Sequence, residues 1–164
     1  MLRDKNLIPL SHQHQRALAL CVRIERASPI AQSDVAAWLA EIAQLFKGEI
    51  RAHFAAEEDV LFPAACRFVE LIPLVEELVS DHEWLRAQFE RGAAGMMAPE
   101  DVRALADRLS AHIRKEERQL FQRLQERMSP EEMAGTGRKL DEALKDSRQA
   151  CILPTQATSL KSAR

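Results

Sequence analysis

The pattern His-x-x-x-Glu-Glu-x-x-Leu-Phe occurs twice in this chain, beginning at His53 and again at His112. Residues four positions apart lie on the same face of an α-helix, one turn above the other. His53 with Glu57, and His112 with Glu116, can therefore each direct an imidazole and a carboxylate toward one point. The repeat favours a helical fold and predicts a metal site with mixed nitrogen and oxygen ligands.

The remainder of the sequence is also typical of an all-α protein. It contains no Tyr and only five Gly, and few segments show the period-two alternation of a half-buried strand. Capping residues, prolines and glycines divide it into four main helices joined by short connections. We therefore expect an antiparallel up-down four-helix bundle with a short extra C-terminal helix.

The expected helix boundaries follow from individual residues. Ser11 caps the first helix, Pro63 kinks or ends the second, and Gly92 ends the third. Gly135 and Gly137 interrupt or weaken the fifth. The predicted helices cover about residues 11–27, 34–63, 73–91, 99–128 and 129–147.

Length and composition limit the class of protein. A chain of 164 residues fits one domain, and we expect the bundle to occupy residues 1–148, with its core at 8–128 and the extra helix at about 129–147. Residues 149–164 are expected to form a loosely packed C-terminal tail. The formal net charge of -2 gives no basic surface for nucleic acid or anionic lipid, and no apolar run reaches the ~20 residues that span a membrane. The N-terminus lacks the apolar core of a signal peptide and the three cysteines show no CxxC spacing, so we expect a cytoplasmic protein.

Each main helix carries one histidine in its row of core-facing apolar residues. His82 and His112 lie at comparable distances from the third connection, and His53 and His82 are placed similarly about the second. His14 and His53 match less well because the second helix is longer, and we expect the 28–33 loop to absorb the difference. The spacing predicts one cluster of four imidazoles and two carboxylates: His14, His53, Glu57, His82, His112 and Glu116.

A purely structural interpretation competes with the metal site. A single His-x-x-x-Glu pair is commonly a minor helix-surface contact, and a lone core histidine is often hydrogen-bonded to a neighbour. For the whole set this interpretation is unfavourable, because burying four histidines and two glutamates without a cation is costly.

Three further polar residues lie next to the predicted ligands. His12 lies about 200° around the helix from His14, on a polar row, and is expected to lie outside the site. Glu58 and Glu117 turn about 100° away from the glutamates that precede them, which favours a surface or outer role. A locally different helical winding would let either carboxylate reach the metal.

These motifs resemble those of the hemerythrin HHE cation-binding family. The matching segments, within about residues 8–128, are LSHQHQRAL around His14, HFAAEEDVLFP from His53, SDHEWL around His82 and HIRKEERQLF from His112. The resemblance implies a four-helix bundle that holds two iron ions in an oxygen-bridged, non-haem di-iron centre. It also implies that Glu57 and Glu116 bridge the irons while the histidines fill terminal positions.

One position departs from the oxygen-carrying hemerythrins that the chain resembles. Those proteins use a fifth terminal histidine, one helical turn before the third-helix ligand, where this chain has Leu78. His12 faces the wrong way to replace it, so one iron is expected to keep an additional open position. The chain also contains no Glu-x-x-His, the spacing of ferritin-like di-iron sites, which disfavours a ferritin-type oxidase or iron store.

Three functional hypotheses follow. The first is a di-iron protein that binds or senses O2 or NO, or acts in iron or nitrosative-stress handling. The second is a di-iron enzyme that consumes peroxide or performs oxidations. The third is a helical partner-binding protein whose metal, such as zinc, is structural. The sequence predicts no nucleic-acid or membrane partner, and it identifies no protein partner.

Overall fold

The computed structural model describes residues 2–147 and 156–160, with the backbone alone for Ser159. Within these residues the regular structure is helical and no β-strand occurs, which confirms the predicted all-α class. Most of the expected tail, namely residues 149–155 and 161–164, lies outside the described residues. No helix in the described part of the chain is long and apolar enough to cross a membrane.

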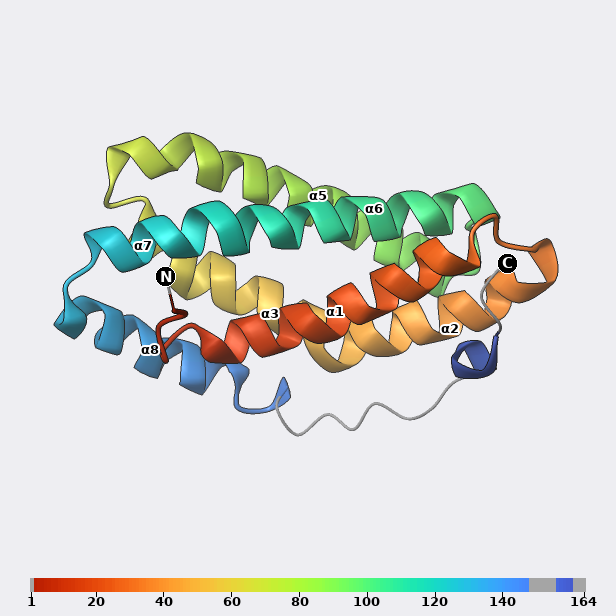
Figure 1. The fold of residues 1–164 in the computed structure, drawn as a ribbon, viewed down its shortest axis with the longest axis horizontal. Helices are drawn as coiled ribbons and strands as arrows, with labels where there is room; N and C mark the ends of the chain where they lie inside the picture. Colours follow the sequence, from red (N-terminus) through yellow and green to blue (C-terminus); the bar gives the residue numbers. More distant parts are fainter. Residues whose placement is uncertain (1, 148–155, 161–164) are drawn as a thin grey trace.

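In the described residues, four long helical segments run along the length of the molecule and a fifth helix lies beside them (Figure 1). The first segment is α1 (Ile8–Ala27) and the third is α5 (Ile72–Ala93). The second consists of α2 (Val35–Leu45), η2 (Phe46–Ile50), α3 (Arg51–Ala56), η3 (Glu57–Leu61) and α4 (Phe62–Ala65). The fourth consists of α6 (Pro99–Lys115), η5 (Glu116–Leu120) and α7 (Phe121–Arg127), and the fifth helix is α8 (Pro130–Leu144). Short 3-10 turns, η1 (Gln32–Asp34) and η4 (Val69–Leu71), precede the second and third segments.

Contacts between the segments place the motifs side by side. α1 packs on α6, and α5 packs on both α2 and α6, so all four long segments share one interior. α8 packs on α3 and on η3, next to the first copy of the repeated motif. The fifth helix is therefore close to the predicted site, although it contributes none of the predicted ligands.

Three turns within these segments are π-helical, which the sequence analysis does not predict. η2 lies in the second segment, while η3 and η5 begin at Glu57 and Glu116, the glutamates of the two motifs. A π turn contains one more residue than an α-helical turn, and such turns are frequent at functional sites. The end of the 28–33 loop forms turn η1, which leads directly into the second segment.

The predicted start of the first helix and the predicted effect of Pro63 on the second differ from the structure. α1 begins at Ile8, before Ser11, whose hydroxyl instead donates a hydrogen bond of 2.7 Å to Glu117. The second segment continues past Pro63 to Ala65. Pro63 has no N–H to donate, and π turn η3 already interrupts the α-helical hydrogen-bond pattern directly before it, so the proline does not end the helix.

The glycines of the C-terminal half also act differently from prediction. Gly92 lies within α5, and the chain turns instead at Gly95, whose φ of 70° suits a residue without a Cβ. α8 runs without interruption through Gly135 and Gly137. A Cβ added at Gly137 would lie 2.3 Å from Oδ1 of Asn6. This glycine therefore does not break the helix but lets the N-terminal segment pack directly against α8.

Two hydrophobic clusters fill the interior, one on each side of a layer of buried polar residues. The first cluster gathers apolar side chains from residues 17–54 and 85–113, and the second gathers those from 56–78 and 120–144 together with Leu7 and Leu10. Ala157, in the 3-10 turn η7 (Gln156–Ser159), is buried against the first cluster, so this part of the predicted tail is packed. The polar layer lies where the long segments pass from one cluster to the other.

Candidate metal centre

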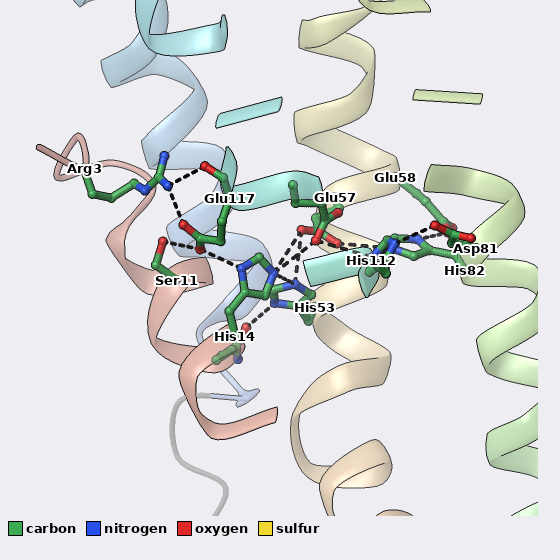
Figure 2. Close-up of polar contacts among 12 residues, drawn as sticks. Arg3, Ser11, His14, His53, Glu57, Glu58, Asp81, His82, His112 and Glu117 are labelled. Carbon is green, nitrogen blue, oxygen red and sulfur yellow. Dashed lines mark hydrogen bonds and ion pairs between the residues drawn. The ribbon is translucent and has the colours of Figure 1, made fainter. Parts of the chain in front are cut away.

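The structure brings all six predicted side chains together in the polar layer. Figure 2 labels His14, His53, Glu57, His82 and His112 among them. Each of the six is between 0 and 2% exposed, and each of the four long segments contributes at least one. The side chains form two groups that share both glutamates: His14 and His53 with Glu57 and Glu116, and His82 and His112 with Glu57 and Glu116. We call these the His14–His53 position and the His82–His112 position.

Within each position the two imidazoles face each other through their Nε2 atoms. The Nε2–Nε2 distance is 2.9 Å between His14 and His53, and 3.1 Å between His82 and His112. Two nitrogens that bind one cation at about 2.1 Å, and at right angles, lie ~3 Å apart. Each pair therefore has the separation of two neighbouring ligands of one ion.

The two glutamates lie between the positions and face both of them. Oε1 of Glu57 lies 3.1 Å from Nε2 of His53, and Oε2 of Glu57 lies 3.4 Å from Nε2 of His82. Oε2 of Glu116 lies 3.2 Å from Nε2 of His14 and 3.3 Å from Nε2 of His112. Carboxylates placed in this way can bind two cations at once.

The four carboxylate oxygens of Glu57 and Glu116 are buried and accept no hydrogen bond from any residue that the structure describes. Buried polar atoms are almost always paired, and two unpaired carboxylates in an apolar interior are costly. Cations held between the imidazoles and the carboxylates would compensate these charges. The donor set therefore fits a metal centre.

In the absence of a cation, protons must supply the positive charge that the two carboxylates need. Burial opposes a charge on His14, but the Glu116 carboxylate, 3.2 Å from its Nε2, and the hydrogen bond to Glu117 raise its pKa to about 10. Burial and the neighbouring Glu116 carboxylate raise the pKa of Glu57 to about 7. Burial and the charge of His14 lower the pKa of His53. A bound metal would take the place of these protons, as it does when metal ligands must be deprotonated.

Each histidine is approached at Nδ1 by a side chain from a neighbouring segment. His14 donates a hydrogen bond to Glu117 (2.7 Å), His53 to Gln13 (2.8 Å) and His82 to Glu58 (2.7 Å). Oδ2 of Asp81 lies 3.5 Å from Nδ1 of His112, which is longer than a normal hydrogen bond. A proton on Nδ1 leaves Nε2 with a free lone pair, which is the form that binds a metal.

Glu58 and Glu117 lie outside both positions, in the outer role that the sequence favours. The helix is wound differently at η3 and η5, yet the two carboxylates contact histidines of other segments rather than join the central cluster. Arg86 donates two hydrogen bonds to Glu58, at 2.8 and 2.9 Å, and Arg3 pairs with the carboxylate of Glu117. These arginines hold the carboxylates that in turn orient the histidines.

Gln13 and Asp81, each 2% exposed, were not predicted from the sequence as partners of the ligand histidines. Each directly precedes a lone histidine, His14 or His82, and adjacent side chains on a helix diverge by about 100°, toward a neighbouring segment. A polar residue beside a core-facing histidine is the signal that would have indicated them. The exposed His12 lies outside the site, as predicted.

Comparison with known families identifies the same part of the chain. The model of the hemerythrin HHE cation binding domain matches residues 9–124, which include all six predicted ligands and exclude α8. No curated protein and no solved structure matched the chain.

Proposed function

This chain belongs to the hemerythrin HHE cation-binding domain family and is a metal-binding protein, and we propose that it holds two iron ions and binds or senses O2 or NO. The proposed ligands are the six residues of the two positions, with Glu57 and Glu116 bridging the ions. We also propose that the four long segments form an antiparallel up-down bundle, with α8 added on the side of α3.

One observation supports the proposal more than any other, namely that the two positions share both glutamates. A single structural ion needs one closed set of ligands. Here two pairs of facing imidazoles lie on either side of two carboxylates, and carboxylates inside a helical bundle are typical of di-iron and di-manganese proteins. Imidazole with carboxylate suits iron, and iron would supply redox chemistry and coordination positions for O2, NO or peroxide.

Apolar side chains next to the two positions exclude water and offer no further ligand. Leu78 lies one helical turn before His82, where the oxygen-carrying hemerythrins have their fifth histidine, and it is fully buried. Leu10 lies one turn before His14 and is also fully buried. The lack of a fifth histidine leaves an additional open position, which favours a second candidate function, a peroxide-consuming or oxidising di-iron enzyme.

Metal analysis of protein purified without oxygen, followed by spectra on exposure to O2, NO and peroxide, tests the proposal. We expect about two irons per chain and reversible spectral changes with O2 or NO. Turnover of peroxide would instead favour the enzyme. Stoichiometric zinc in protein from iron-replete cells, with no spectral response to any of the three, would reject both and favour a structural metal.

A further inference from the structure

We infer that α8, the helix outside the family match, controls the His14–His53 position and leaves the His82–His112 position independent of it. The control passes from Ser147, three residues after the end of α8, through Gln13 to His53. The inference rests on the proposed two-metal centre. It assigns a role to a helix that contributes no ligand.

Ser147 fixes the orientation of the Gln13 amide. Ser147 is 6% exposed, and its hydroxyl donates a hydrogen bond of 2.9 Å to the carbonyl oxygen of Leu144, the last residue of α8. Because its proton is used there, the hydroxyl oxygen accepts a hydrogen bond of 3.1 Å from Nε2 of Gln13. The NH2 group of the amide is therefore turned toward Ser147, and the carbonyl oxygen toward His53.

The orientation of Gln13 in turn sets the tautomer of His53. Oε1 of Gln13 lies 2.8 Å from Nδ1 of His53 and can only accept, so the proton is held on Nδ1 and the lone pair on Nε2. If the amide rotated by half a turn, its NH2 group would face Nδ1. His53 would then accept at Nδ1 and carry its proton on Nε2, where it would block the metal.

A second connection runs from α8 to His14. Asn6 of the N-terminal segment lies directly against Gly137 of α8. Within the segment, the backbone and side-chain N–H groups of Asn6 each donate a hydrogen bond of 2.8 Å to Asp4, which fixes its local conformation. From this segment Arg3 contacts Glu117, including its backbone oxygen at 2.9 Å, and Glu117 accepts the hydrogen bond from His14. Arg3, like α8, lies outside the family match.

The His82–His112 position is supported from within the matched domain. Asp81 accepts hydrogen bonds from Arg108 (2.7 Å) and Lys115 (3.1 Å), both on α6, while Glu58 is held by Arg86 on α5. A carboxylate accepts hydrogen bonds at either oxygen, so Asp81 has no orientation that would place a donor against His112. This position therefore does not need a group such as Ser147.

The test measures release of two ferrous ions from anaerobically reconstituted protein to a coloured chelator. Loss of a side chain that orients a metal ligand typically weakens metal binding by about 10- to 100-fold. In Ser147→Ala we expect one iron to be released about tenfold faster and the other at the unchanged rate. The matched control is Ser80→Ala, at an exposed serine next to Asp81, which should release both irons as the unsubstituted protein does.

A second variant separates orientation of the amide from loss of packing. In Gln13→Glu both side-chain oxygens can only accept a hydrogen bond from Nδ1 of His53, so Ser147 is no longer needed to orient the side chain. Adding Ser147→Ala to Gln13→Glu should therefore no longer speed the release of iron. The spectrum of the iron that remains in Ser147→Ala should also match that of His53→Ala, which lacks one ligand of the same position. Equal acceleration of both irons, no acceleration, or an effect that persists with Glu at position 13 would overturn the inference. Failure of the unsubstituted protein to take up two ions would instead reject the proposed function itself.

Discussion

His53 is supported by a neutral amide, whereas His112, on the other side of the shared glutamates, lies beside the anionic Asp81. The two halves of the centre otherwise correspond closely. The corresponding pairs are His14 and His82, His53 and His112, Glu117 and Glu58, Leu10 and Leu78, and Phe121 and Phe62. Gln13 and Asp81 are the corresponding residues that differ in charge.

This difference predicts unequal affinity of the two positions. Burial alone would favour the neutral form of Asp81, but the nearby His112 imidazole and hydrogen bonds from Lys115 and Arg108 hold the pKa of its carboxyl well below the ordinary value. An anionic partner raises the basicity of a metal-bound histidine, and a neutral amide does so less. We therefore expect the His82–His112 position to hold its ion more tightly.

The largest expected effect on iron content comes from a substitution that weakens both positions at once. Glu57 faces both positions, so Glu57→Ala deprives both ions of a ligand. Anaerobic reconstitution and metal analysis should give fewer than one iron per chain instead of two, while circular dichroism shows that the helices persist. Uptake of two irons by this variant would contradict the bridging role of Glu57.

Removing a terminal histidine should affect one half only. His53→Ala and His82→Ala should each lower the metal content from two ions to about one, because each imidazole serves a single position. The matched control is His12→Ala, at an exposed histidine of α1, which should keep two ions. If His12→Ala emptied the site while His14→Ala did not, the ligand proposed for the first helix would be wrong.

The sequence was sufficient to predict that these six side chains lie together, because the information that this required is local. Helical periodicity places His53 and Glu57 on one face, and a histidine in each apolar row identifies the common interior. The π turns at Glu57 and Glu116 could not be predicted in the same way. They depend on how neighbouring segments pack around the helix, which no local propensity records.

The side chains that orient a ligand histidine from another segment could not be predicted from the sequence either. Gln13 and Asp81 orient histidines of other helices, and this role becomes visible only when the neighbouring segment and its height are known. Glycine often interrupts a helix, but Gly137 instead allows Asn6 to approach α8 closely. Which residue approaches a glycine is a property of tertiary packing alone.

Changing the charge of either differing residue should alter the rate of iron release from one position, with a smaller effect than loss of a ligand. Asp81→Asn should speed release of iron from the His82–His112 position by about tenfold, and Gln13→Glu should slow release from the His14–His53 position. The two phases of chelator release measure both rates in one experiment. If both variants changed the same phase, the assignment of one outer partner to each position would be wrong.

The smallest expected effect on metal content comes from a substitution that disturbs the packing of the N-terminal segment on α8. In Gly137→Ala the new Cβ would lie 2.3 Å from Oδ1 of Asn6, so the segment must shift, and we expect the free energy of unfolding to fall by about 1–3 kcal/mol. Gly135→Ala is the matched control, because a Cβ there meets only the end of Arg138, at 3.8 Å, and should stabilise the helix by about 0.4–1 kcal/mol. Denaturant unfolding of the metal-free proteins measures both changes, and each variant should still bind two ions. Equal stability of the two variants would show that Asn6 does not pack on α8, which would remove the connection through Arg3 and leave Ser147 as the route from α8 to the centre.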